Sequence, residues 1–362
     1  MQQQWWIFIE ALGLSIVVSV LVTTWVIKNG RKWGIIDDPA THKLPKVVHK
    51  TAVPRGGGIP IVAALIVGVT IFLASYGRMW GIVAGAVILA ITGWIDDKYS
   101  EKISPFLRLI LNGTAALCVV GVGIGIAFIT NPLTGGVIRL DQPQWCFGTH
   151  CIWLVADIFA VIWLIIMQNM VGWSSGVDGQ MPGFVVIAAV AMAVLAARSN
   201  DANQLSVIVL AAITAGAYLG FLFFNWYPQK IMPGYGGKSL AGFLLGVMAI
   251  MSSAKVGALL LVLGIPFVDA VMVSIKRMRE GRLPVWGGRE HMHHYLLDHG
   301  WGKRKIALLY WGVSGVMAIA AVTLHAPEKY FTMAGVGVVL VGIILWLQNW
   351  STFSKQPDRD SG

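Results

Sequence analysis

The sequence predicts an all-α polytopic membrane protein with about eleven transmembrane helices, its N-terminus outside and its C-terminus in the cytoplasm. Hydrophobic residues make up 56% of the 362 positions and the mean hydropathy is +0.71, both too high for a soluble globular protein. Apolar runs recur along the chain, and basic residues are unevenly divided between the segments that connect them. We therefore expect a single integral membrane domain over residues 1–362, with a motif-bearing core from about 30 to 305.

Each apolar run is interpreted as one helix, because about 20 helical residues are needed to cross the hydrocarbon of a bilayer. The runs lie near residues 5–27, 57–75, 79–95, 106–130, 151–169, 182–197, 204–225, 239–253, 256–275, 306–325 and 331–349. The first run has no basic segment before it and no small-residue cleavage pattern, so we interpret it as a span and not as a signal peptide.

The distribution of Lys and Arg predicts the orientation, because an excess of these residues marks cytoplasmic loops. With the N-terminus outside, 22 of the 27 Lys and Arg residues fall on the inner side and 5 on the outer side. The same asymmetry explains the net charge of +10 without a nucleic-acid partner. Cys146 and Cys151 share an outer loop, where they could pair if the loop faces an oxidising compartment.

Two polar motifs border the first inner segments. Arg55 precedes Gly56–Gly58, and glycines at a helix start let backbone N–H groups approach an anion; a basic loop lying on anionic headgroups is the alternative. Asp96 and Asp97 end the third run and could hold Mg²⁺ or accept a proton in phosphoryl transfer. A helix end that meets water, with Lys98 as partner, is the alternative interpretation.

Two further inner loops carry polar residues. The segment 169–183 begins with Asn169, contains Asp178 and lacks Lys and Arg, which suits a loop folded inward around a ligand; a plain turn is the alternative. Lys230 and Lys238 flank a glycine-rich turn after the seventh run, and together they could bind a diphosphate.

The last inner loop carries a histidine cluster, His291, His293 and His294, close to Arg289. Imidazole either ligates zinc or donates an N–H group to a phosphate. A structural zinc site would need a fourth ligand, and the inner loops have no cysteine to supply it. We therefore favour phosphate binding.

In this order, the motifs resemble those of the polyprenyl-phosphate N-acetylhexosamine-1-phosphate transferases, glycosyltransferase family 4, over about residues 30–305. The most specific segments are 93–98 and 289–294, and the His-x-His-His pattern is closer to the amino-sugar branch than to the peptide-carrying one. The resemblance implies transfer of a sugar 1-phosphate, GlcNAc 1-phosphate in particular, from a UDP-N-acetylhexosamine to undecaprenyl or another polyprenyl phosphate. It also implies Mg²⁺ as cofactor, and a cytoplasmic active face on the inner membrane that serves cell-envelope glycan synthesis.

The resemblance also implies roles for individual residues. Asp96 and Asp97 are the implied catalytic residues, with Asp96 as the base that deprotonates the lipid phosphate. Binding of the nucleotide sugar and its phosphates is implied for Arg55, Asn169, Asp178, Lys230, Arg289, His291, His293 and His294. Asp97 and Asp178 are the implied Mg²⁺ ligands.

Two positions depart from the family pattern, since Gly172 and Tyr235 stand where members usually ligate Mg²⁺. Either Asp96, Asp97 and Asp178 bind the cation in a rearranged way, or the protein binds its ligands without turning them over. An active transferase and a catalytically impaired binding protein therefore both remain open.

A transporter is a third interpretation, because Glu10, Asp157 and Asp269 lie within apolar runs and intramembrane carboxylates often mark ion paths. Asp269 could equally pair with Lys276 or with a histidine of the basic loop. A homodimer is compatible with the sequence, which leaves the identity of the sugar, the polyprenol length and the polymer pathway open.

Overall fold

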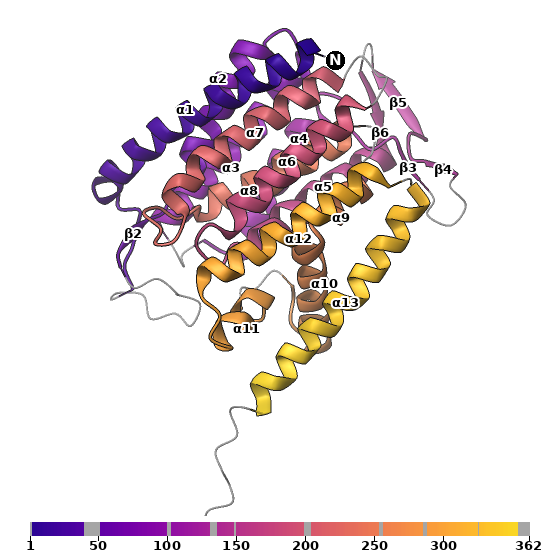
Figure 1. Ribbon diagram of the computed structural model, residues 1–362. Helices are drawn as coiled ribbons and strands as arrows, with labels where there is room; N and C mark the ends of the chain where they lie inside the picture. The colour runs from indigo at the N-terminus through magenta and orange to yellow at the C-terminus, as the bar shows by residue number, and fades with distance from the viewer. Residues whose placement is uncertain are drawn as a thin grey trace, which may run out of the picture.

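The computed structural model describes residues 2–39, 51–99, 103–130, 136–147, 150–198, 204–252, 256–284, 288–324 and 326–353. Long helices form a bundle, and short antiparallel strand pairs lie at its edges (Figure 1). The predicted all-helical class is therefore confirmed. Part of the predicted inner charge, in segment 40–50 and after residue 353, lies outside the described residues.

Within these ranges, eight helices are long and apolar enough to cross a membrane. They are α1 (Gln2–Trp33), α3 (Arg78–Lys98), α5 (Leu154–Trp173), α6 (Gln180–Ala197), α7 (Gln204–Asn225), α8 (Gly234–Met251), α12 (Lys303–Thr323) and α13 (Ala326–Phe353). The pair α9 (Val256–Val262) and α10 (Gly264–Arg279) is bent by 92° and makes a ninth span if it is counted as one.

Each of the eleven predicted runs contains an apolar helix, but two of these helices are short. α2 (Gly58–Phe72) has 15 residues and α4 (Pro105–Val120) has 16, fewer than the about 20 needed for a full crossing. The helix predicted over 106–130 ends at Val120 because every second residue from 121 to 125 is glycine. Gly123 adopts φ +78°, in the left-handed region where glycine carries no steric penalty.

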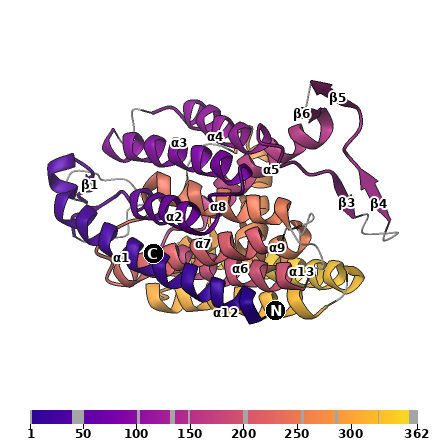
Figure 2. The ribbon, with the colours of Figure 1, turned by 90° about the horizontal axis from the view of Figure 1, so that it is seen from above.

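The centre of the bundle consists of α6, α7 and α8. Of their most apolar segments, 72%, 78% and 83% of residues are buried, against 28% for α1 and 17% for α13. α7 packs against α1 and α6, while α8 packs against α3 and α5. Figure 2 shows α3 and α4 on one side of this centre and α12 on the other. The exposed apolar side chains of the outer helices, such as Leu21, Ile319 and Val338, suit contact with lipid.

Three strand pairs occur in the described part of the chain. β1 (Ile36–Asp37) pairs with β2 (Val53–Pro54), β3 (Phe128–Thr130) with β4 (Val137–Arg139), and β5 (Gln144–Phe147) with β6 (His150–Trp153). Cys146 and Cys151 are register partners in the last pair. Cys146 is disulfide-bonded whereas Cys118 is free, in agreement with the predicted pairing.

Glycines bring α2, α3 and α8 into backbone contact at one end of the bundle. A Cβ atom added to Gly93 would lie 2.2 Å from the Cα atom of Gly236, and one added to Gly58 would lie 3.0 Å from the same atom. Small residues allow membrane helices to approach this closely. The last turn of α3 is therefore held against the first turn of α8, and this junction positions the acidic residues of the site.

Candidate functional site

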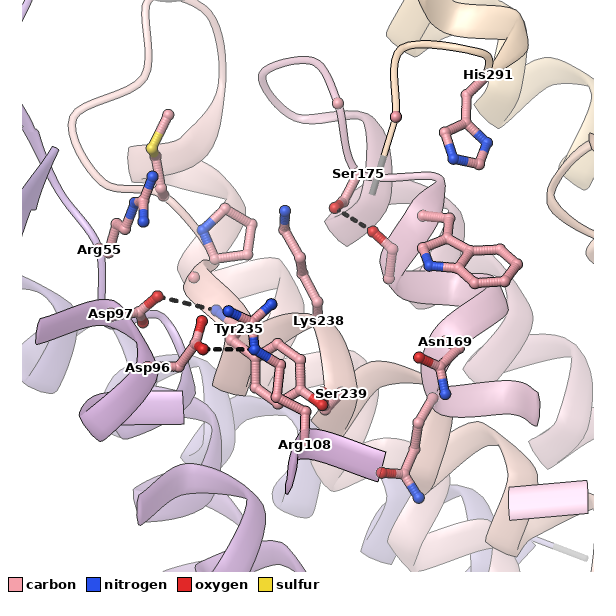
Figure 3. A pocket seen from close by; sticks show the side chains of 18 of the residues that line it. Arg55, Asp96, Asp97, Arg108, Asn169, Ser175, Tyr235, Lys238, Ser239 and His291 are labelled. Atoms are coloured by element: carbon pink, nitrogen blue, oxygen red, sulfur yellow. Dashed lines mark hydrogen bonds and ion pairs between the residues drawn. The ribbon is translucent and has the colours of Figure 1, made fainter. Parts of the chain in front are cut away.

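A cavity of about 390 Å³ lies at the end of the bundle where the predicted polar motifs meet (Figure 3). Its walls come from the segment before α2, the ends of α3, α5 and α10, the starts of α4 and α8, and the residues around the start of α11 (Met292–Asp298). The volume suits a small-molecule ligand. Seven of the ten predicted site residues line the cavity: Arg55, Asp96, Asp97, Asn169, His291, His293 and His294.

The carboxylate of Asp97 is held by the backbone at the start of α8. Its Oδ1 atom accepts a hydrogen bond from the N–H group of Tyr235 at 3.0 Å. Its Oδ2 atom is buried and has no hydrogen-bond partner among the described residues. A Cβ atom on Gly234 would lie 2.0 Å from that oxygen, and Gly234 has φ +62°. Only glycine therefore combines this backbone conformation with this close approach.

The carboxylate of Asp96 is held by a different partner. The Nε atom of Arg108 lies 2.7 Å from Asp96 Oδ1, and the guanidinium group lies 5.4 Å from the centre of the Tyr235 ring. The hydroxyl group of Tyr235 donates to Asn112 Oδ1 at 3.0 Å. Arg108 thus bridges one carboxylate and one aromatic ring, while Asp96 itself remains part of the cavity wall.

Sequence reasoning did not select Arg108 as a site residue. It lies in the first turns of α4, whose start is fixed by Ser104 and Pro105: the Ser104 hydroxyl accepts from the N–H group of Leu107 at 3.2 Å. A Ser-Pro helix start is readable from the sequence. It places Arg108 one turn into the helix, but only the fold reveals that this turn faces Asp96.

Arg55 reaches the cavity from the strand pair β1–β2. Its Nε atom donates to Asp37 Oδ2 at 3.0 Å, and Asp37 is almost fully buried. The ion pair fixes the guanidinium group beside the carboxylates of α3 (Figure 3). The glycines that follow Arg55 serve helix packing, since a Cβ atom on Gly57 would lie 2.7 Å from the Cα atom of Pro233.

The histidine cluster forms the opposite wall. Asp269, buried on α10, binds His291 Nδ1 through Oδ2 at 2.8 Å and accepts the N–H group of Met292 through Oδ1 at 2.8 Å. Because a carboxylate only accepts hydrogen bonds, the proton of neutral His291 lies on Nδ1 and leaves Nε2 for a ligand. The ring of His293 stacks on that of His291, with centroids 5.7 Å apart.

The two following histidines are neutral at physiological pH. Burial lowers the pKa of His293 well below its usual range. Burial, together with the charge of Arg289, lowers the pKa of His294 to about 4. Neutral imidazole both donates and accepts a hydrogen bond, so these rings can bind polar groups without adding charge. The predicted preference for phosphate over zinc at this cluster stays a prediction.

The end of α5 supplies an amide and an aromatic ring to the cavity. Asn169 donates through Nδ2 to the Ile165 carbonyl oxygen at 2.8 Å, which leaves its Oδ1 atom for a donor. The ring of Trp173 lies 6.0 Å from that of His291. Arg277, a further lining residue that the sequence did not single out, lies over Trp173 and donates to Glu290 at 2.8 Å.

Three predicted site residues do not line the cavity. Asp178 accepts from Lys303 Nζ at 2.9 Å and from the N–H group of Gln229 at 3.2 Å, so it ties three segments together behind the wall. Arg289 forms an ion pair with Asp298, and Lys230 is exposed. Their roles in binding remain predictions.

The carboxylates present do not fit the implied Mg²⁺ site. Mg²⁺ is usually bound by one or two accessible carboxylates together with substrate phosphates. Asp97 has one oxygen bonded to Tyr235 and the other buried beneath Gly234, and Arg108 engages one oxygen of Asp96, so this pair offers a cation at most one oxygen. Asp178, the second implied ligand, is outside the cavity. No group of three or more His, Cys, Asp or Glu side chains suited to a metal ion occurs in the described part of the chain.

Two of the three carboxylates proposed for an ion path, Asp157 and Asp269, have local partners. Asp157 accepts the N–H group of Trp153 at 3.0 Å at the start of α5, and Asp269 holds His291. Of the two partners offered for Asp269, the histidine is thus the correct one. Neither residue needs a transport role to explain its position.

Comparison with known proteins identifies relatives over most of the chain. The model of glycosyl transferase family 4 matches residues 79–253. The chain is 24% identical to the probable undecaprenyl-phosphate N-acetylglucosaminyl 1-phosphate transferase of Bacillus subtilis, over 92% of this chain and 89% of that protein. It is 28% identical to the decaprenyl-phosphate N-acetylglucosaminephosphotransferase of Mycobacterium leprae, over 82% and 79%. It is also 28% identical to the phospho-N-acetylmuramoyl-pentapeptide-transferase of Clostridioides difficile, over 78% and 85%.

Proposed function

The chain belongs to glycosyl transferase family 4, as its motifs predicted, and we propose that this phosphoglycosyl transferase transfers GlcNAc 1-phosphate from UDP-GlcNAc to undecaprenyl or another polyprenyl phosphate. The observation that carries the proposal is the convergence of Asp96, Arg108 and the histidine cluster on one cavity. The choice of GlcNAc is supported by the names of the Bacillus and Mycobacterium relatives and by the His-x-His-His pattern.

The reaction joins two anions of roughly two negative charges each, so their repulsion is the first barrier to overcome. Arg55, Arg108 and Lys238 all line the same cavity and offset this charge. An oxygen of the polyprenyl phosphate attacks the β-phosphorus of UDP-GlcNAc. The bond between this phosphorus and the bridging oxygen breaks, and UMP leaves with that oxygen and its electron pair, which yields polyprenyl-diphosphate GlcNAc.

Asp96 is the proposed proton acceptor for a protonated lipid phosphate. Arg108 engages its Oδ1 atom, so Oδ2 is the atom that accepts the proton. Asp97 positions the N-terminus of α8 through the N–H group of Tyr235. Because the positive end of a helix dipole favours an anion, that N-terminus adds to the attraction for phosphate.

The histidine wall is the proposed binding surface for the nucleotide diphosphate. His291 is held by Asp269 with Nε2 available to the ligand, and His293 is buried and neutral. Asn169 lies beside this wall (Figure 3). With its proton on Nδ1, His291 offers Nε2 as an acceptor for a hydroxyl or N–H group of the nucleotide sugar, whereas the N–H groups of neutral His293 and His294 can donate to phosphate oxygens.

For the membrane topology we propose eleven crossings, with the cavity on the cytoplasmic side of the inner membrane. The excess of Lys and Arg on that side supports the orientation. The 15 and 16 residues of α2 and α4 cross a bilayer if flanking side chains reach the interface or the bilayer thins locally.

The test is a transfer assay on membranes or on purified protein. Labelled UDP-GlcNAc and undecaprenyl phosphate are expected to give a labelled lipid, and an equal amount of UMP. Parallel reactions with UDP-GalNAc and UDP-MurNAc-pentapeptide check the choice of sugar. If none of the three donors gives a lipid product, the proposed activity is wrong.

A binding protein without turnover is a second candidate, favoured by the departures at Gly172 and Tyr235, both of which line the cavity. Calorimetry distinguishes it: UDP-GlcNAc would bind with micromolar affinity while the transfer assay stays blank. Formation of the lipid product excludes this candidate.

A further inference from the structure

From the arrangement around Tyr235 and Lys238, we propose that the ammonium group of Lys238, and not Mg²⁺, supplies the cationic charge at the diphosphate in this chain. The family typically uses Mg²⁺, so the inference assigns this chain a transfer reaction that proceeds without a divalent cation. It rests on the function proposed above, which it deepens.

The first step concerns Tyr235, which stands where the resemblance implies a metal ligand. The phenol hydroxyl is directed to Asn112, and the ring carries the guanidinium group of Arg108 on its face. A neutral ring in this position stabilises a cationic side chain, whereas a carboxylate would bind one ion directly. Where the resemblance implies a residue that ligates Mg²⁺, this chain therefore has a tyrosine that stabilises the guanidinium group of Arg108.

The second step concerns the position of Lys238. It follows Tyr235 by three residues in α8, so both side chains lie on the same face of the helix. Figure 3 shows Lys238 between the Asp96–Asp97 pair on one side and Ser175 and His291 on the other. Its charge interacts with both carboxylates and with His293. A lysine in this place can reach phosphate groups that bind across the cavity.

The third step is electrostatic. Arg55, Arg108 and Lys238 place three positive charges on the walls of one cavity of about 390 Å³. The same cavity is lined by Asp37, Asp96 and Asp97, and Arg55 and Arg108 pair with the first two of these carboxylates. Those two ion pairs and the buried Oδ2 atom of Asp97 reduce the carboxylate oxygen that a Mg²⁺ ion could bind, and the fixed cations repel the ion.

The reaction needs positive charge beside the phosphates, which either a metal ion or a cationic side chain can supply. Phosphoryl transfer depends on positioning and on stabilising the negative charge of the transferred group and the leaving group. Lysine binds phosphate as a compact point charge with three N–H donors. In the transfer step Lys238 donates to the non-bridging oxygens of the diphosphate, and the bonds formed and broken are those given above.

The experiment uses the full-length protein purified into lipid nanodiscs, with UDP-GlcNAc and undecaprenyl phosphate. After chelation with EDTA, UMP release is expected to stay within about twofold of the rate in MgCl₂, because Arg55, Arg108 and Lys238 supply the positive charge that a metal ion would supply. A loss of about tenfold or more in EDTA that MgCl₂ restores would overturn the inference and leave the proposed function intact.

Variants sharpen the test. Lys238→Met is expected to lower kcat/KM in EDTA by about 100-fold, and Lys238→Arg to keep part of the activity. The control is Lys28→Met, an exposed lysine on α1 that does not line the cavity, which is expected to leave the rate unchanged. The double variant Tyr235→Asp with Lys238→Met adds a carboxylate and removes the ammonium group, so it is expected to require Mg²⁺. A double variant as inactive with Mg²⁺ as without it, yet folded by size-exclusion chromatography, contradicts the inference.

Binding of UDP separates a failure of the inference from a failure of the proposed function. If no donor is turned over in either condition, the proposed function is wrong and calorimetry with UDP alone decides the inference. Equal Kd values in EDTA and MgCl₂, weakened about tenfold by Lys238→Met, support it. A Kd that Mg²⁺ tightens about tenfold in the unchanged protein overturns it.

Discussion

The cavity has two unlike walls. The acidic wall, formed by α3, α4 and α8, carries Asp96, Asp97, Arg108 and Lys238. The imidazole wall, formed by α5, α10 and α11, carries Asn169 and the three histidines. The acidic wall contains charges of both signs, whereas burial keeps His293 and His294 of the imidazole wall neutral. The acidic residues, Arg108, Lys238 and the proton acceptor lie on one side; on the other the two histidines are neutral and the one lining arginine, Arg277, is paired with Glu290.

The two walls are also built differently. Backbone contact holds the acidic wall, since Gly93 and Gly236 touch and Gly234 lies against Asp97. A side chain holds the imidazole wall, because Asp269 reaches from the bent helix pair to His291. Substitutions in the first wall are therefore expected to disturb charge and chemistry, and those in the second to disturb ligand orientation.

The largest effect is expected for Asp96→Asn on the acidic wall. An amide cannot accept the proton of the lipid phosphate, so kcat is expected to fall by about 10²- to 10⁴-fold. Asp141→Asn, between β4 and β5 and paired with Arg139, is the matched control and is expected to leave kcat unchanged. An Asp96→Asn protein that keeps its rate of UMP release shows that the carboxylate is not the proton acceptor.

A smaller effect is expected for Gly234→Ala. The new methyl group would lie 2.0 Å from Asp97 Oδ2 on a backbone with φ +62°, so Asp97 must move, and kcat is expected to fall by about 100-fold. Gly281→Ala is the control, because Gly281 has φ +70° but open space around it. That control is expected to lose about 1 kcal/mol of stability from the backbone alone and to keep its kcat. Equal kcat values for Gly234→Ala and Gly281→Ala would show that the close packing of Gly234 against Asp97 does not matter for catalysis.

Next comes Asp269→Asn, which tests the imidazole wall. The amide can donate to His291 Nδ1, which would shift the ring proton to Nε2, the atom facing the ligand. The expected loss in kcat/KM is about 10- to 100-fold, with the tautomer change visible by ¹⁵N NMR of labelled histidine. Asp157→Asn, at the start of α5, is the control with unchanged kcat/KM. An unchanged His291 tautomer in the variant contradicts the positioning role.

The smallest effect concerns pH. The folded-state pKa of His294 is about 4, below the unfolded value of about 6.5, so the unfolded chain binds more protons between these pH values. Stability is therefore fully present above about pH 6.5 and decreases as the pH falls towards about 4, by an amount on the order of 2 kcal/mol at pH 5. Thermal unfolding at pH 7 and pH 5 measures the change, which His294→Gln is expected to reduce. Identical pH dependence in both proteins would exclude His294 as its source.

Local sequence features predicted much of the site. Asp96 and Asp97, Arg55, Asn169 and the three histidines line one cavity, as their polarity between apolar runs suggested. Arg108 was missed because nothing in the residues between Asp96 and Arg108 predicts that the first turns of α4 face the end of α3. Asp178 was assigned to ligand binding because its loop lacks Lys and Arg and because of the family resemblance; the sequence did not predict its pairing with the distant Lys303.

Hydrophobic runs by themselves determined that this chain crosses a membrane many times, because the apolar length of a helix is a local property. Residue identity likewise determined which groups have phosphate and proton chemistry. Only the tertiary structure decided where α2 and α4 end, how α9 and α10 bend, and which oxygens of Asp97 remain reachable. These features depend on glycine contacts and hydrogen bonds between residues far apart in the chain, and no local pattern encodes them.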